Sequence, residues 1–236
     1  MEIGHIYLIH LERRTDRKDG YFKVDKNGEF ILDNNGEKIW IKGFVEKLEG
    51  VFSEYEVFPA IDGMELDVQL QPQTGQNRWN KGAYALTLTT IKILEDAMEK
   101  GYENILILED DVVINPLFDI VIDNYLSDMT FKFDFAFLGY TTFGNCAKPE
   151  TRYWDRIVQM CSCHAYIVNK HLFPTYKNIL SQLNVPIDVH VNSIVAARLN
   201  SFSAVKWSGH KLIWQEDGIS DIEAEGGKFY AVGFTD

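Results

Sequence analysis

Cysteine is scarce in this chain of 236 residues, which contains three: Cys146, Cys161 and Cys163. An odd count with a single i, i+2 pair does not make a disulfide framework, so we expect a reducing compartment. Cys161, Cys163 and His164 do not have the spacing of a zinc site. A buried strand with small apolar thiols explains these residues better.

Long apolar runs and an excess of positive charge are also missing. No stretch approaches the length of a membrane span. The first residues lack a basic segment followed by an apolar core, so neither a transmembrane segment nor a signal peptide is expected. The formal net charge of -12 argues against non-specific binding to nucleic acid or anionic membranes. We therefore expect a cytoplasmic protein, and its length predicts one domain over residues 1–236.

The stretch that points most clearly to chemistry is an apolar run, residues 105–108, followed by Glu109, Asp110 and Asp111. The run has no polar alternation, which predicts a strand buried on both faces. Ligands bind at the carboxyl ends of such strands. Because side chains alternate along a strand, Glu109 and Asp111 should share one side and Asp110 should face the other. Such a pair suits Mg²⁺ or Mn²⁺. The alternative is an acidic turn that only solvates the strand end.

A basic window follows the first predicted strand, residues 3–9. Arg13, Arg14, Arg17 and Lys18 would lie at the ligand edge of the sheet. Arginine side chains match phosphate oxygens in a bidentate manner, which favours binding of a nucleotide or diphosphate. The alternative is a solvated helix start, capped by a residue at 15 or 16.

The remaining patterns alternate between strands and helices. Further strands are predicted at 55–58, 133–138 and 162–168, and helices at 81–100, 116–127, 170–182 and from 185 onward. This order predicts an α/β fold with a mostly parallel sheet flanked by helices. Two Asn-Gly turns predict a small three-stranded β-meander over 21–42, either a flap over the site or decoration. The tail beyond 207 lacks periodicity and is expected to wrap back over the site.

Taken in order, several segments resemble glycosyltransferase family 25, which includes bacterial lipooligosaccharide sugar transferases and collagen galactosyltransferases. Residues 6–17 resemble the family's first strand and Asn-Leu-x-Arg-x-x-x-Arg motif, with His10 in place of the Asn. Residues 60–63 resemble its Ala-x-Asp-Gly, and 108–112 match its acidic motif. Residues 81–90 are similar to its helix motif, with Thr90 in place of the final His. Residues 164–166, 186–188, 215 and 220–222 resemble its later motifs.

The resemblance implies a GT-A (Rossmann-type) fold, a nucleotide-sugar donor (usually a UDP-sugar), a divalent metal ion and inversion at the anomeric carbon. It implies Mn²⁺ or Mg²⁺ at Glu109 and Asp111, with His210 or Gln215 from the tail as a further ligand. Asp188 is the candidate general base, or else an acid favoured by the helix dipole. The implied donor-binding residues are Leu11, Glu12, Arg13, Arg14, Arg17, Asp62, Gly63 and Asp110.

The function expected from these observations is metal-dependent, inverting transfer of a hexose. Galactose or glucose would pass from a UDP-sugar to a hydroxyl of a glycan or protein acceptor. The alternative is a binding module that holds nucleotide or glycan without turnover. It is motivated by Thr90, which stands where the family has a histidine. A phosphohydrolase or phosphotransferase is a third possibility, but residues 111–113 do not supply the nucleophilic Asp-x-Asp followed by Thr or Ser.

Overall fold

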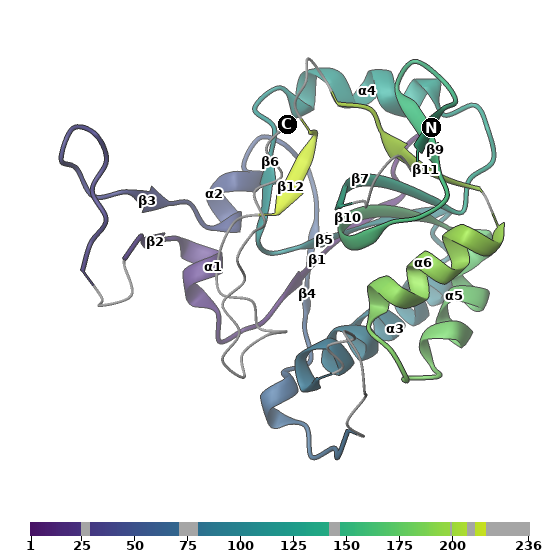
Figure 1. Ribbon diagram of the computed structural model, residues 1–236, viewed down its shortest axis with the longest axis horizontal. Coiled ribbons are helices and arrows are strands. Elements are labelled where there is room, and N and C mark those ends of the chain that lie inside the picture. The colour runs from purple at the N-terminus through teal and green to yellow at the C-terminus, as the bar shows by residue number, and fades with distance from the viewer. Residues whose placement is uncertain (25–28, 71–79, 142–146, 199, 207–210, 216–236) are drawn as a thin grey trace.

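The computed structural model describes residues 1–24, 29–70, 80–141, 147–198, 200–206 and 211–215. Its centre is an eight-stranded sheet (Figure 1). In spatial order the strands are β4 (Glu56–Pro59), β1 (His5–His10), β5 (Asn104–Glu109), β10 (Cys161–Asn169), β7 (Phe135–Thr141), β11 (Ser201–Ala204), β9 (Trp154–Ile157) and β8 (Ala147–Pro149). Six of them (β4, β1, β5, β7, β11 and β8) run in one direction, whereas β10 and β9 run in the other. The predicted α/β class with a mostly parallel sheet is confirmed.

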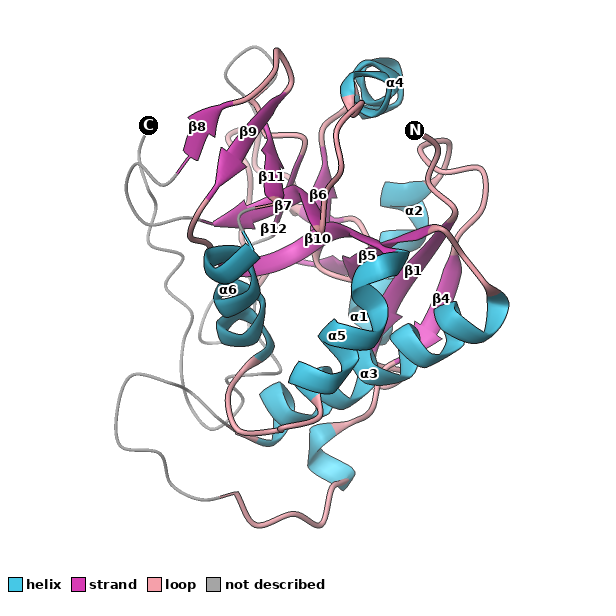
Figure 2. Cartoon of the chain, turned by 90° about the vertical axis from the view of Figure 1, so that its right-hand side faces the viewer, coloured by secondary structure: helices cyan, strands magenta, loops and turns pink. Residues whose placement is uncertain are grey.

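Helices cover both faces of this sheet (Figure 2). One face carries α3 (Lys81–Lys100), α5 (Phe173–Leu180) and α6 (Ile187–Arg198), and the other carries α2 (Phe44–Leu48) and α4 (Phe118–Asp128). Strand β5 contributes to both cores, because Ile105 and Ile107 pack on the first face and Leu106 and Leu108 on the second. All four are at most 1% exposed, which explains the apolar run without alternation.

The boundaries of α3 follow from its caps. The Asn80 side chain accepts a hydrogen bond of 2.9 Å from the Ala83 backbone N–H at the start of the helix. Gly101 ends it in the left-handed conformation, with φ of 72°. The helix predicted at 81–100 is therefore confirmed. The other predicted helices are present with shifted ends, and a short 3₁₀ turn, η2 (Lys170–Leu172), precedes α5.

Several short elements were not predicted from the sequence. Strands β8, β9 and β11 lie in segments without a strand pattern, and β6 (Val112–Ile114) pairs antiparallel with β12 (Ile213–Gln215). Both β6 and β12 have only three residues, so neither carries a readable period, and their pairing joins segments about a hundred positions apart. This pair brings the tail to the acidic stretch.

The segment 21–42 projects from the body next to α1 (Thr15–Asp19) (Figure 1). Its strands β2 (Tyr21–Phe22) and β3 (Trp40–Ile41) pair antiparallel, and isolated bridges join Val24 to Phe30 and Leu32 to Lys38. The antiparallel arrangement agrees with the predicted β-meander, although residues 25–28, with the first Asn-Gly turn, lie outside the described residues. Within the described ranges, none of the helices combines the length and apolarity needed to cross a bilayer.

Candidate active site

A cavity of about 380 Å³ opens at the carboxyl ends of β1, β4 and β5. Its walls come from these strand ends, from the 3₁₀ turn η1 (Gly63–Glu65), from the first turns of α3 and from the end of β12. The lining residues are Ile9, Leu11, Arg13, Arg17, Ala60, Ile61, Asp62, Gly63, Met64, Asn80, Lys81, Gly82, Ala85, Leu86, Glu109, Asp110, Asp111 and Gln215.

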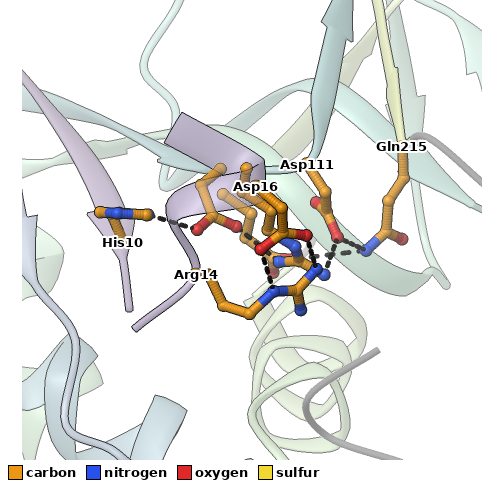
Figure 3. A network of polar contacts seen from close by, with 8 residues as sticks. His10, Arg14, Asp16, Asp111 and Gln215 are labelled. Carbon is orange, nitrogen blue, oxygen red and sulfur yellow. Dashed lines mark hydrogen bonds and ion pairs between the residues drawn. The ribbon is translucent and has the colours of Figure 1, made fainter. Parts of the chain in front are cut away.

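Glu109 and Asp111 share a partner on one wall of this cavity. Strand β5 ends at Glu109, the chain turns at Asp110 and Asp111, and β6 begins at Val112. Because β12 places Gln215 opposite Val112, the Gln215 side chain reaches both acids. Its Nε2 donates to Asp111 Oδ2 at 3.1 Å (Figure 3). The same Nε2 donates to Glu109 Oε2 at 3.4 Å. Of the tail, the structure describes residues 211–215, and this part reaches the acidic residues through Gln215.

Asp110 has different partners from its two acidic neighbours. Its Oδ2 lies 2.7 Å from His10 Nδ1, and its Oδ1 accepts a hydrogen bond of 2.5 Å from Arg17 Nη1. Arg17 Nη2 also lies 3.3 Å from Asp111 Oδ2. Figure 3 shows this network of polar contacts between His10 and Asp111, with Gln215 beside Asp111. Asp110 is 5% exposed, and both of its carboxylate oxygens have protein partners.

The Glu109–Asp111 pair carries more negative charge than its surroundings compensate. Burial and the neighbouring Asp111 raise the pKa of Glu109 well above its ordinary value, although Arg17 opposes the shift. Burial likewise raises the pKa of Asp111, against the effect of Arg17. Asp111 Oδ1 is buried and accepts no hydrogen bond from the described residues. An additional cation would relieve this arrangement.

The donor atoms available there are carboxylate oxygens, which hard divalent cations such as Mg²⁺ and Mn²⁺ prefer. Glu109 and Asp111 therefore fit the predicted metal, and these two residues would hold it. Within the described ranges no third His, Cys, Asp or Glu joins them in a metal-binding group. The Gln215 side chain, a further predicted ligand, contacts both carboxylates of the pair through its Nε2. His210, the other predicted ligand, lies outside the described residues.

A second wall of the cavity is held by an ion pair. Arg13 Nε donates to Asp62 Oδ2 at 2.5 Å, and Asp62 Oδ1 caps η1 by accepting from the Met64 N–H at 2.9 Å. Although burial acts in the opposite direction, these two donors lower the pKa of Asp62. Next to it, a Cβ on Gly63 would lie 2.5 Å from the Lys81 carbonyl oxygen. Only glycine therefore fits where η1 meets α3.

The structure brings most of the predicted donor-binding residues to this cavity. Leu11, Arg13, Arg17, Asp62, Gly63 and Asp110 line it. Glu12 and Arg14 do not belong to the lining, and Arg14 instead donates to Asp16 at 2.8 and 2.7 Å. The wall formed by the start of α3 was not predicted from the sequence, although the Asn80 cap was an available signal. A role for His10 was not predicted either, because it stands out in the sequence only as a departure from the family motif.

Asp188 lies in the first turn of α6 and is not among the described residues that line the cavity. Its Oδ1 accepts from the Val189 N–H at 2.9 Å, which fits an acid at a helix start. Its negative charge also contributes to the raised pKa of Glu109, so the two carboxylates lie within electrostatic reach. Thr90 is fully buried, and its Oγ1 donates to the Leu86 carbonyl oxygen at 3.0 Å.

Comparisons with known proteins agree with this architecture. A family model, that of glycosyltransferase family 25 (LPS biosynthesis protein), matches residues 3–191. A solved structure, that of a glycosyltransferase involved in the glycosylation of the major capsid of PBCV-1, is similar with a TM-score of 0.51. The likeness covers 94% of this chain and 96% of that one at 14% identity, so it shows the fold alone.

A second structure is similar at a lower level. The mannose-1-phosphate geranyltransferase from Thermus thermophilus matches over 90% of this chain and 76% of its own, with 10% identity and a TM-score of 0.45. No curated protein sequence matches the chain.

Proposed function

The chain belongs to glycosyltransferase family 25, and on that premise we propose that it transfers a hexose from a UDP-sugar to a hydroxyl of a glycan or protein acceptor. Galactose and glucose are the proposed sugars. We propose further that the reaction inverts the anomeric carbon and depends on Mn²⁺ or Mg²⁺. The donor would bind in the cavity at the ends of β1, β4 and β5.

One observation carries this proposal: the cavity contains an acidic pair and two arginines on neighbouring walls. Glu109 and Asp111 suit a divalent cation, and Arg13 and Arg17 suit phosphate oxygens. A nucleoside diphosphate needs both kinds of partner, because its phosphates bind cationic side chains and its metal ion binds carboxylates. The cavity volume of about 380 Å³ is within the range of small-molecule sites.

In the proposed reaction the acceptor oxygen attacks the anomeric carbon from the face opposite the diphosphate. The bond between the anomeric carbon and the diphosphate oxygen breaks as the new glycosidic bond forms, which inverts the configuration. Asp188 accepts the hydroxyl proton of the acceptor. Arg13 and Arg17 bind the departing phosphates. A divalent cation held by Glu109 and Asp111 would neutralise charge on the leaving group.

The departure from the family motif at position 90 does not favour the binding-module alternative. Thr90 is buried in the core of the protein, and its hydroxyl donates a hydrogen bond to the Leu86 carbonyl oxygen within α3. It is not one of the described cavity-lining residues. The replaced histidine therefore gives no reason, on this geometry, to expect an impaired donor site.

The proposal is tested by UDP release from a panel of UDP-sugars, with and without Mn²⁺. We expect release by the wild type with Mn²⁺ and an inverted product anomer by NMR. Asp188→Asn should lower kcat by about 10²–10⁴ with UDP binding retained, whereas Asp111→Asn should lose UDP binding. Glu103→Gln, which removes an exposed acid paired with Lys170, is the control. UDP binding without release from any donor would support the binding module instead. Release of phosphate from simple esters would support a phosphohydrolase.

A further inference from the structure

Arg17 contacts two of the three acids at the end of β5. Its Nη1 donates to Asp110 Oδ1 at 2.5 Å, and its Nη2 lies 3.3 Å from Asp111 Oδ2. The Arg17 side chain is 15% exposed and the Asp111 side chain 14%, so this contact is largely shielded from water. A shielded guanidinium at this position supplies positive charge to the carboxylate that is also a proposed metal ligand.

The contacts of Arg17 with the two acids differ in strength and in surroundings. The contact of the guanidinium with Asp110 is the shorter one. The second oxygen of Asp110 lies 2.7 Å from His10 Nδ1, and this contact holds the carboxylate in place. Asp111 is held by the longer contact and shares its Oδ2 with Gln215. Its Oδ1 has no partner among the described residues. Arg17 is therefore anchored to Asp110 and only secondarily engaged with Asp111.

We propose that Arg17 is the resident counter-charge of Asp111 and that a divalent cation displaces its guanidinium from that carboxylate. Asp110, backed by His10, keeps the displaced guanidinium at the cavity wall, where its released donor binds the diphosphate of the nucleotide. This inference rests on the proposed function, because it takes the cavity to bind both a metal ion and a nucleoside diphosphate. It makes Arg17 a residue that couples the two binding steps.

The coupling gives Arg17 effects of opposite sign on the two ligands. In the absence of nucleotide, Arg17 competes with the metal ion for Asp111 and lowers metal affinity. In the presence of metal, the same guanidinium donates to the phosphates and raises nucleotide affinity. An arginine that only maintained the fold of α1 would not produce effects of opposite sign, because its loss would weaken the binding of the metal ion and of the nucleotide together.

The experiment measures Mn²⁺ affinity by electron paramagnetic resonance of free Mn²⁺, without nucleotide, and UDP affinity by calorimetry at saturating Mn²⁺. For Arg17→Gln we expect about tenfold tighter Mn²⁺ binding and about tenfold weaker UDP binding. Arg17→Lys keeps the charge and should leave Mn²⁺ affinity near that of the wild type. Arg14→Gln removes the same charge from the same turn, where Arg14 pairs with Asp16, and should change Mn²⁺ affinity far less.

The outcomes separate this inference from the proposed function. If the wild type binds Mn²⁺ and UDP but Arg17→Gln binds Mn²⁺ with equal or lower affinity, the displacement is wrong and the donor site stands. Equal tightening by Arg14→Gln would also overturn it, because a general loss of charge would then explain the effect. If the wild type binds neither Mn²⁺ nor UDP, the proposed function fails and this inference fails with it.

Discussion

Gly63→Ala should both destabilise the protein and weaken nucleotide binding. The added Cβ would lie 2.5 Å from the Lys81 carbonyl oxygen, 2.6 Å from its carbon and 2.8 Å from the Gly82 nitrogen. All three are backbone atoms at the start of α3, so no side chain can move aside. Ordinary contact begins at 3.4 Å, so η1 and α3 must separate by about 0.9 Å (3.4 − 2.5).

Such overpacking typically costs about 1–3 kcal/mol, which lowers the Tm of a chain of this size by roughly 2–12 °C. The separation also moves Asp62 and its partner Arg13, which form one wall of the cavity. We therefore expect UDP affinity at saturating Mn²⁺ to fall by about tenfold. Thermal unfolding and titration calorimetry measure the two effects on the same preparation.

Gly50→Ala is the matched control for this substitution. Gly50 has φ of 75°, and a Cβ there would meet nothing within 4 Å. This variant should lose about 1 kcal/mol through backbone strain alone and keep its UDP affinity. Unchanged stability and unchanged UDP affinity in Gly63→Ala would refute the reasoning, because the clash would then have been absorbed without moving the wall.

Two further predictions concern groups away from the cavity. Asp134→Asn should lower the free energy of unfolding in urea by about 1–3 kcal/mol, because the fully buried carboxylate accepts from His171 Nε2 at 2.6 Å and from Arg198 Nε at 2.7 Å; an unchanged midpoint would contradict this. Burial, assisted by Lys211, lowers the pKa of His164 to about 4, whereas the unfolded chain takes up this proton near pH 6.5. The free energy of unfolding should therefore fall by about 3 kcal/mol as the pH drops from 6.5 to 4, and His164→Gln should lose less over that interval.

The part of the fold that sequence patterns predicted is the part formed by long or uninterrupted elements. Strand β5 was evident because both its faces are buried, and α3 because its apolar residues follow helical spacing up to Gly101. Strands β6 and β12 were missed because their stability comes from pairing with each other across the sequence. A pairing of this kind leaves no local pattern to read.

In the candidate site, too, some contacts could be expected from the sequence and others could not. Glu109 and Asp111 were expected to share a side because side chains alternate along a strand. Both contact Gln215, although Asp111 lies in the turn after β5. The contact of His10 with Asp110 could not be predicted, because it depends on the parallel register that sets β1 beside β5. The sequence alone also could not show which arginine contacts the acidic residues. In the structure Arg17 donates to Asp110, whereas Arg14 donates to Asp16.

Calorimetric titration of UDP into the wild type and Asp111→Asn, each with and without Mn²⁺, tests most directly whether the acidic pair holds the donor. We expect UDP to bind the wild type only when Mn²⁺ is present, and Asp111→Asn to remove this dependence together with tight binding. Equal UDP affinity in all four titrations would contradict this expectation, because the acidic pair at the end of β5 would then have no part in holding the donor.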